Sequence, residues 1–173
     1  MYERHAAAIR AYAARRVEAS AVDDVVAETF AIAWRRLPSQ AEPLPWLYGV
    51  ARRVVHGHRR GQARRAALTA RLISRHGAGP APPDPADLIE GDPRLSRAFA
   101  TLSEVEREAI RLIAWEGLTS DEAAVAAGCS PATFAVRLSR AKAHLARSLA
   151  ALADAPPPRP ASSLTTVEIC HDH

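Results

Sequence analysis

The segment Leu118–Arg147 constrains the fold of this 173-residue chain more than any other stretch. Thr119 and Glu122 have the spacing of a capping box, so we expect a helix to begin there. A run of small residues follows and ends at Gly128, the residue type best suited to a left-handed helix end. The segment therefore predicts a helical hairpin with a tight glycine turn.

The second helix of this hairpin is both amphipathic and basic. Ser130 can cap it, and Pro131 suits its first position. Its apolar stripe is Phe134, Leu138, Ala141 and Leu145, and its cations are Arg137, Arg140, Lys142 and Arg147. This pattern is typical of a helix-turn-helix whose second helix enters the DNA major groove, although a hairpin packed in a core would share the caps and the stripe.

The rest of the sequence favours helices over sheets. Alanine is frequent, aromatic residues are few, and no run of β-branched residues alternates as a strand requires. Residues 76–93 are rich in Pro, Gly and Asp and separate a helical block at 2–75 from another at 94–152, while the proline-rich tail 153–173 is predicted to be disordered. We expect an all-α protein of two small helical domains joined by a flexible linker.

The first block should form a three-helix bundle. The helices are predicted over Glu3–Val17 and Ala21–Leu37 and from Pro45 onward. The expected core residues of the second helix are Val22, Val25, Val26, Phe30, Ala33, Trp34 and Leu37. Three amphipathic helices of this length can just bury a core of their own. In the second block, Ser103 and Glu106 form another capping-box pair and predict a helix before the hairpin.

Positive charge is concentrated in the first block. The whole chain carries a net charge of +4, but residues 1–75 hold 14 arginines against six acidic residues. Arg52–Arg75 contains eight arginines and no acid. Such a patch attracts phosphate and repels itself when no anion is bound, so it indicates a nucleic-acid partner.

Cysteine content and the absence of targeting signals indicate a cytoplasmic protein. Cys129 and Cys170 alone make no disulfide framework, which fits a reducing compartment. No secretory signal and no apolar run of membrane-spanning length is visible, so we expect no membrane insertion.

The sequence offers little support for an enzyme or a metal protein. His56 and His58 are two residues apart on a predicted helix and point to different faces. Cys170, His171 and His173 supply three ligand types for zinc but lack a second half with zinc-finger spacing. No glycine-rich phosphate loop or nucleophile–base pair is recognisable. We expect no catalysis, no metal and no cofactor.

The order of these elements resembles that of the extracytoplasmic-function sigma factors of bacterial RNA polymerase. Asp23–Leu37 and Pro45–Val55 resemble the sigma-2 domain, while Leu102–Ser130 and the helix that continues through Arg140 resemble the sigma-4 domain. The resemblance implies an alternative sigma factor that binds core RNA polymerase, recognises −35 and −10 promoter elements and aids duplex opening. It also implies an anti-sigma factor as a partner, besides the polymerase and promoter DNA.

The resemblance assigns residues to three surfaces by their position. The polymerase-binding residues are Asp24, Glu28 and Thr29. The −10 residues are Arg52, Arg53, Arg59 and Arg60. The −35 residues are Ser130, Pro131, Ala132, Thr133, Val136, Arg137 and Arg140. Promoter melting uses cations and aromatic wedges, so Trp46 and Tyr48 either stack on opened bases or belong to the core.

Four positions depart from the family pattern, and one rival function remains. The chain has Ala27, Arg53 and Gly57 where the family usually has Gln, Asn and Asp, and Ala135 in the recognition helix where a lysine is common. An unusual −10 preference or weak −10 binding is therefore expected. The rival is a free-standing helix-turn-helix regulator that binds duplex DNA as a dimer. It would require a dimerisation surface and would leave the first block unexplained.

Overall fold

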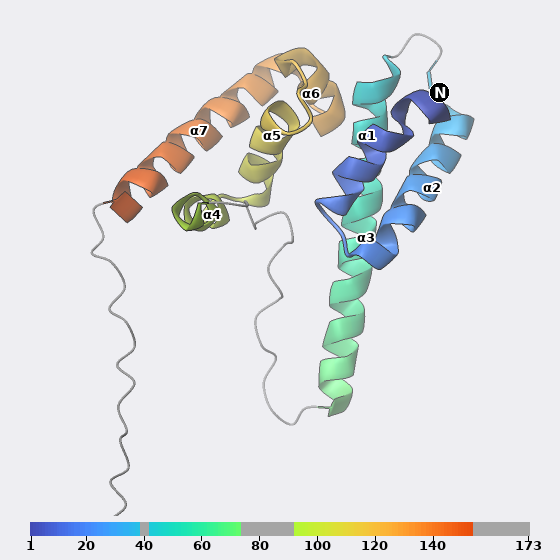
Figure 1. Ribbon diagram of the computed structural model, residues 1–173, viewed down its shortest axis with the longest axis horizontal. Helices are drawn as coiled ribbons and strands as arrows, with labels where there is room; N and C mark the ends of the chain where they lie inside the picture. Colours follow the sequence, from blue (N-terminus) through green and yellow to red (C-terminus); the bar gives the residue numbers. More distant parts are fainter. Residues whose placement is uncertain (39–41, 74–91, 154–173) are drawn as a thin grey trace, which may run out of the picture.

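A computed structural model describes residues 1–38, 42–73 and 92–153, and within these ranges every regular element is an α-helix. The helices are α1 (Tyr2–Ala14), α2 (Ala19–Arg36), α3 (Pro43–Ile73), α4 (Pro93–Ala100), α5 (Glu104–Ala114), α6 (Ser120–Ala127) and α7 (Pro131–Ala153) (Figure 1). The all-α prediction is confirmed. Within the described ranges no helix is both long and apolar enough to cross a membrane. The predicted linker (76–93) and tail (153–173) lie almost entirely outside the described residues.

Helices α1, α2 and α3 form the N-terminal unit, a three-helix bundle as predicted (Figure 1). The buried residues of α1 are Ile9, Tyr12 and Ala13, and α3 buries Leu47, Val50, Ala51 and Val54. Helix α3 begins at Pro43, two residues before the proline expected to open it. Only the first part of α3 lies in the bundle, and its distal half projects beyond both α1 and α2 (Figure 1).

The prediction that Trp34 belongs to the core is wrong, because its side chain is 88% exposed. The residues of α2 that face α1 and α3 include Val26, Phe30 and Ala33, all of which are buried. One further position turns the helix by about 100°, which carries Trp34 away from that face. The apolar stripe in the sequence is thus wider than the face that the bundle covers.

The C-terminal unit, α4–α7, contains one helix more than predicted. Helix α4 begins after Asp92, whose carboxylate accepts hydrogen bonds from the backbone N–H groups of Arg94 (2.8 Å) and Leu95 (3.4 Å). The Asp–Pro pair that suggested a linker is instead a helix cap followed by proline at the first helical position. Buried Phe99 belongs to α4, which packs against α7.

Both predicted capping boxes are confirmed. The Ser103 backbone N–H donates to the Glu106 carboxylate at 2.8 Å, and the Glu106 N–H donates to the Ser103 hydroxyl at 3.4 Å. Thr119 and Glu122 make the same pair of bonds, at 2.8 and 3.3 Å. Gly128 ends α6 with φ +68°, in the left-handed region as predicted. Helices α6 and α7 therefore form the expected helix-turn-helix.

The capping boxes predict part of the acid sensitivity of the fold. Hydrogen bonds from the backbone and the hydroxyl of Ser103 lower the pKa of Glu106, and those of Thr119 lower the pKa of Glu122. A carboxylate with a depressed pKa in the folded state stabilises the fold above its ordinary pKa of about 4.3 and loses that contribution as the pH falls. The Glu106→Gln, Glu122→Gln variant should lose less stability between pH 6 and pH 3 in urea unfolding than the unchanged chain. An equal loss of unfolding free energy in the variant and the unchanged chain would contradict this prediction.

The two units pack against each other, although the sequence predicts only a flexible linker between them. Helix α6 lies against α3, and buried apolar residues of both units form one continuous cluster. The helix backbones approach closely at Gly49, where an added Cβ would lie 3.2 Å from the carbonyl oxygen of Ala126. The absence of a side chain at Gly49 permits this contact. We call this arrangement the closed packing.

Candidate nucleic-acid and polymerase interfaces

The predicted −35 face of α7 is open to solvent. Its exposed residues are Ser130, Pro131, Ala132, Thr133, Val136 and Arg140. Arg137 is partly buried. The Ser130 hydroxyl accepts a hydrogen bond from the Thr133 N–H at 3.2 Å and so caps the helix. On the opposite side of α7, Phe134 and Ala141 are buried. The core therefore fixes one side of α7 while the other presents a basic face.

The four arginines predicted for the −10 element fall into two pairs on α3. Arg53 and Arg60 are exposed, and together with Arg52 and His56 they line a shallow depression. Arg52 donates to the carbonyl oxygen of Ala127 in α6 at 3.0 Å. The second engaged arginine, Arg59, is described below with its partners. All four cations thus lie on one helix, but only Arg53 and Arg60 are exposed to solvent.

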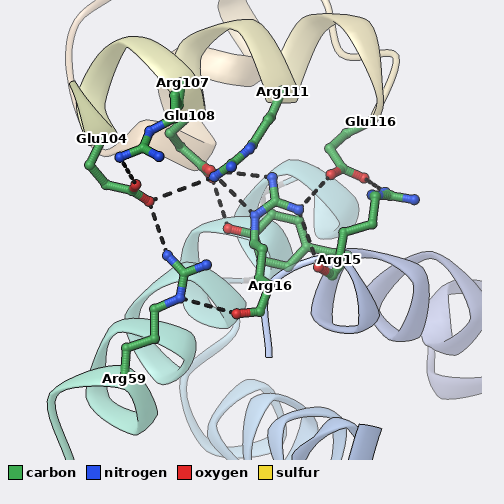
Figure 2. Close-up of polar contacts among 9 residues, drawn as sticks. Arg15, Arg16, Arg59, Glu104, Arg107, Glu108, Arg111 and Glu116 are labelled. Carbon is green, nitrogen blue, oxygen red and sulfur yellow. Dashed lines mark hydrogen bonds and ion pairs between the residues drawn. The ribbon is translucent and has the colours of Figure 1, made fainter. Parts of the chain in front are cut away.

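Arg59 contacts both units. Its Nη1 donates to the Glu104 carboxylate of α5 at 3.2 Å, and its Nε donates to the carbonyl oxygen of Arg16 at 3.1 Å (Figure 2). The side chain of Arg59 is 27% exposed, against 37% for Glu104. Arg59, which is predicted to contact DNA, therefore takes part in a polar contact between α3 and the C-terminal unit.

Neither aromatic side chain at the start of α3 is placed to stack on opened bases. Tyr48 is buried, with its ring centroid 5.4 Å from that of Tyr12, and Trp46 packs partly buried against the core. Burial, followed by the nearby Glu116 carboxylate, raises the pKa of Tyr48 to about 12. Of the two alternatives left open by the sequence, these contacts favour the core.

The predicted polymerase surface on α2 is only partly exposed. Asp24 and Glu28 are exposed, one helical turn apart, and Glu28 lies 3.6 Å from the imidazole of His58. Thr29 is wrongly placed in this set, since its side chain is fully buried and its hydroxyl has no hydrogen-bond partner among the described residues. Position 29 belongs to the inward face of α2, so its side chain cannot contact a partner in this conformation.

A buried cluster of charges joins the two units, and the sequence reasoning missed it. Arg16, 2% exposed, follows α1 and donates to Glu108 of α5 at 3.2 Å and to Glu116 at 3.0 Å (Figure 2). The Tyr12 hydroxyl donates to Glu108 at 2.8 Å, and Arg15 bonds the second oxygen of Glu116. We call these five residues the Arg16 cluster.

The protonation states of the Arg16 cluster follow from its burial. Burial, reinforced by the Glu108 carboxylate, raises the pKa of Tyr12 well above its ordinary value. Burial opposes the charge on Arg16, but Tyr12, Glu108 and Glu116 outweigh this and raise the pKa of the guanidinium. Tyr12 is therefore a neutral donor, and Arg16 is a cation at neutral pH.

One signal in the sequence marks Arg16. In the helix predicted over Glu3–Val17 it falls on one face with Tyr12, Ala13 and Val17, all of which are buried, although α1 itself ends at Ala14. A charged residue on an apolar stripe calls for a buried partner of opposite charge. The identity of that partner depends on the packing of the other unit, which the spacing does not give.

No group of three or more metal-ligating side chains occurs among the described residues. The terminal Cys170, His171 and His173 lie outside them. Cys129, near the glycine turn, is a free thiol.

The fold and surfaces define a two-unit helical protein with a helix-turn-helix in its second unit. The family descriptions of sigma-70 region 2 and sigma-70 region 4 match residues 1–65 and 93–145. The chain is 32% identical over 153 residues to the ECF RNA polymerase sigma factor SigC of Mycobacterium tuberculosis, covering 81% of this chain and 73% of the relative. The chain belongs to the family of extracytoplasmic-function sigma factors, which are non-enzymatic initiation factors, and the predicted resemblance is confirmed.

Further comparisons agree with this membership. The chain is 29% identical over 141 residues to the probable sigma factor RfaY of Xanthomonas campestris, spanning 76% of this chain but only 35% of RfaY. The sigma factor RpoE of Bartonella quintana, solved with the anti-sigma factor NepR, shares the fold with a TM-score of 0.59, 23% identity, and coverage of 86% and 94% of the two chains. CnrH, solved with the cytosolic domain of CnrY, gives a TM-score of 0.53 at 27% identity, with coverage of 87% and 85%.

Proposed function

We propose that this chain binds core RNA polymerase through the exposed face of α2 and directs it to promoters. Residues 2–75 act at the polymerase and the −10 element, 94–152 act at the −35 element, and 76–93 connect the two. Because transcription takes place in the bacterial cytoplasm, the chain works there. The observation that carries the proposal is the solvent-open, basic face of α7 in a unit that matches sigma-70 region 4.

The −35 assignment predicts the effect of removing two cations from α7. Arg137 and Arg140 stand on successive turns of the open face, where a guanidinium can bind phosphate or a guanine edge. The Arg137→Ala, Arg140→Ala variant should bind promoter DNA at least about tenfold more weakly, since each good contact contributes about 1–3 kcal/mol. Gel-shift titration measures this effect, and far-UV circular dichroism should show unchanged helix content. Unchanged promoter affinity would remove α7 from the DNA contact.

The polymerase contact is proposed for the exposed face of α2. Asp24 and Glu28 supply negative charge, and the exposed Trp34 stands about three helical turns from the first of them. An exposed tryptophan is a frequent anchor of protein interfaces. This role accounts for the exposure of Trp34, which is otherwise unfavourable.

Charge reversal on α2 should weaken polymerase binding. The acidic residues of α2 suit a basic partner surface. The Asp24→Arg, Glu28→Arg variant would be repelled by such a surface, so its affinity for core RNA polymerase should fall at least about tenfold. The matched control, Glu18→Arg with Glu42→Arg, changes the net charge equally at exposed positions outside this face. An equal loss in both variants would indicate a net-charge effect and contradict a specific contact.

Gel filtration with purified core RNA polymerase tests the proposed function. Co-elution with the polymerase supports it. A stable homodimer that ignores the polymerase would support the free-standing regulator instead. An anti-sigma factor is a further proposed partner, as the family implies and as the RpoE structure with NepR illustrates.

A further inference from the structure

We infer that the part of α3 that projects beyond the bundle is a further contact for duplex DNA, in which Arg64 binds a backbone phosphate (Figure 1). We call residues 57–73 the distal segment. The inference rests on the proposed function and adds to it, because Arg64 lies outside the residues assigned to the −10 element. It also gives a role to Gly57 and Gly61, which keep the distal segment marginally stable, so that it becomes fully helical when DNA binds.

The distal segment is exposed on all sides over more than two helical turns. Residues 62–69 are each exposed, and eight consecutive positions of a helix cover its whole circumference. These residues therefore have no buried apolar face, and most helices in proteins depend on such a face for their stability. The stability of the distal segment as a helix is thus set mainly by its own sequence.

The charges of the distal segment oppose its helical form when no partner is bound. Between His56 and Ile73 the sequence has no acidic residue, so no carboxylate within the segment can pair with its arginines. Arg60 and Arg64 are four positions apart, where like charges repel each other and destabilise a helix. Both side chains are exposed. An anion held between the two guanidinium groups would remove this repulsion.

Gly57 and Gly61 lower the stability of the same segment further. Both lie in the interior of α3, where glycine is among the least favourable residues. A Cβ added at either position meets nothing within 4 Å, whereas at Gly49 it would lie 3.2 Å from a carbonyl oxygen of α6. Close packing therefore explains Gly49 but neither of the other two. They follow Val55, the last buried residue of α3 among those described, and stand one turn apart.

Arg64 continues a line of open cations that begins in the −10 set. Arg53, Arg60 and Arg64 are spaced by seven and four residues, which places them within about 40° of one another around the helix axis. All three are exposed, and none has a hydrogen-bond or ion-pair partner among the described residues. Arg65 is exposed as well but is turned by about 100° from Arg64. The line therefore offers one face of α3 to an anionic surface.

The chemistry of the distal segment fits a DNA duplex better than a single strand. Proteins hold single-stranded DNA largely by stacking its bases on aromatic side chains, and residues 57–73 contain no Phe, Tyr or Trp. Guanidinium groups on phosphates position a protein on a duplex without reading its sequence. The line from Arg53 to Arg64 is about 16 Å long, the rise of about five base pairs. Its partner is therefore the backbone of the duplex that adjoins the −10 element.

Ordering of the distal segment on binding follows from these features. DNA phosphates bring negative charge between arginines that repel each other in the free chain, so bound DNA favours the helical form. A segment that becomes ordered on binding loses part of the binding free energy to that ordering. Replacing both glycines by alanine removes part of this cost in advance, so it should strengthen DNA binding without adding a contact.

Two neighbouring arginines provide the test of the contact and its matched control. Arg64→Ala and Arg65→Ala remove the same charge from exposed positions, but only Arg64 lies on the line of open cations. Both are made in the full chain with Arg137→Ala and Arg140→Ala, so that binding through α7 does not mask the effect. Fluorescence anisotropy with a labelled 30-base-pair duplex should show at least about threefold weaker binding for Arg64→Ala, with a salt dependence shallower by about 0.9. Arg65→Ala should change the affinity by less than about 1.5-fold.

Circular dichroism at 222 nm, with the spectrum of the duplex subtracted, tests the ordering. The unchanged chain should gain helix signal when the same duplex is added. The Gly57→Ala, Gly61→Ala variant should have more helix before DNA is added, gain less on binding, and bind the duplex at least about threefold tighter. Adding Ala63→Gly and Ala67→Gly to that variant should reverse both changes, because it returns two glycines to exposed positions of the same segment.

Equal losses from Arg64→Ala and Arg65→Ala would overturn the contact, because general attraction to a basic helix would explain them. A larger effect of Arg64→Ala on a single strand of the same sequence would also overturn it and assign the distal segment to melted DNA. A helix signal that does not rise on DNA binding would overturn the ordering. These measurements need no polymerase, so they decide the inference even if no chain initiates transcription and the proposed function fails.

Discussion

Replacing Arg16 with methionine is expected to weaken the closed packing by about 3–5 kcal/mol, the usual cost of leaving a buried charge without its partner. Glu116 would keep its bond to Arg15, whereas Glu108 would lose its ion pair with Arg16 and keep its bond to the neutral Tyr12 hydroxyl. Methionine fills much of the space of the arginine stem, so the loss is mainly electrostatic. Amide hydrogen exchange along α6 should speed up by two or more orders of magnitude wherever exchange follows the opening of the units.

A variant without any of the three charges provides the control for Arg16→Met. The triple variant Arg16→Met, Glu108→Gln, Glu116→Gln removes the three charges together, so none of the three is left without its partner and the loss should be smaller than for Arg16→Met alone. Exchange of α6 in this triple variant should return toward that of the unchanged chain. Strictly additive losses would show that the three side chains do not act as one ionic cluster.

Phe134→Ala is expected to destabilise the C-terminal unit by about 3–5 kcal/mol, the range for truncating a buried aromatic side chain. Phe134 is 1% exposed and lies in the continuous cluster shared by both units. Its removal leaves a cavity under the first turn of α7, so the helix that presents the −35 residues should lose its fixed position. Urea unfolding followed by circular dichroism at 222 nm measures the change.

Val136, two residues along the same helix, provides the matched control. Its side chain is 51% exposed on the −35 face, so Val136→Ala should change the stability by no more than about 0.5 kcal/mol. Any effect of Val136→Ala should appear in promoter affinity instead. Equal destabilisation by both substitutions would contradict the assignment of one face to the core and the other to DNA.

Features set by neighbours in the sequence could be predicted, because the interactions that cause them are local. The capping boxes at Ser103 and Thr119 and the left-handed Gly128 depend on residues within a few positions, and all three are confirmed. Helix α4 is the exception although its cap is equally local, because the proline-rich composition around Asp92 and Pro93 predicts a linker. For this segment the Asp–Pro capping signal is a better guide to the structure than the proline-rich composition.

Features set by packing could not be predicted to the same depth. The apolar periodicity of α2 predicts that Trp34 faces the core, and Thr29 is assigned to the exposed face. Both predictions are wrong, because Trp34 is exposed and Thr29 is buried. Periodicity gives the direction of the apolar face but not its width, which depends on how much of α2 the neighbouring helices cover. The same limit explains why the engagement of Arg52 and Arg59 appears only when both units are in place.

The contact between the units could not be inferred from a proline-rich connection. Gly49 in α3 and Ala126 in α6 are 77 positions apart in the chain, and each is ordinary for its own helix. Small residues on two helices permit a close approach, but they do not specify which helix will pack against which. Only the joint position of Arg16 and its two glutamates shows that the approach is specific.

Run-off transcription with bacterial core RNA polymerase, on a fragmented library of the source genome, tests the central claim most directly. The account predicts discrete transcripts that require this chain and that disappear with Arg137→Ala, Arg140→Ala. Silence on every template, with a chain that is folded by circular dichroism and polymerase that is active with another initiation factor, would contradict it.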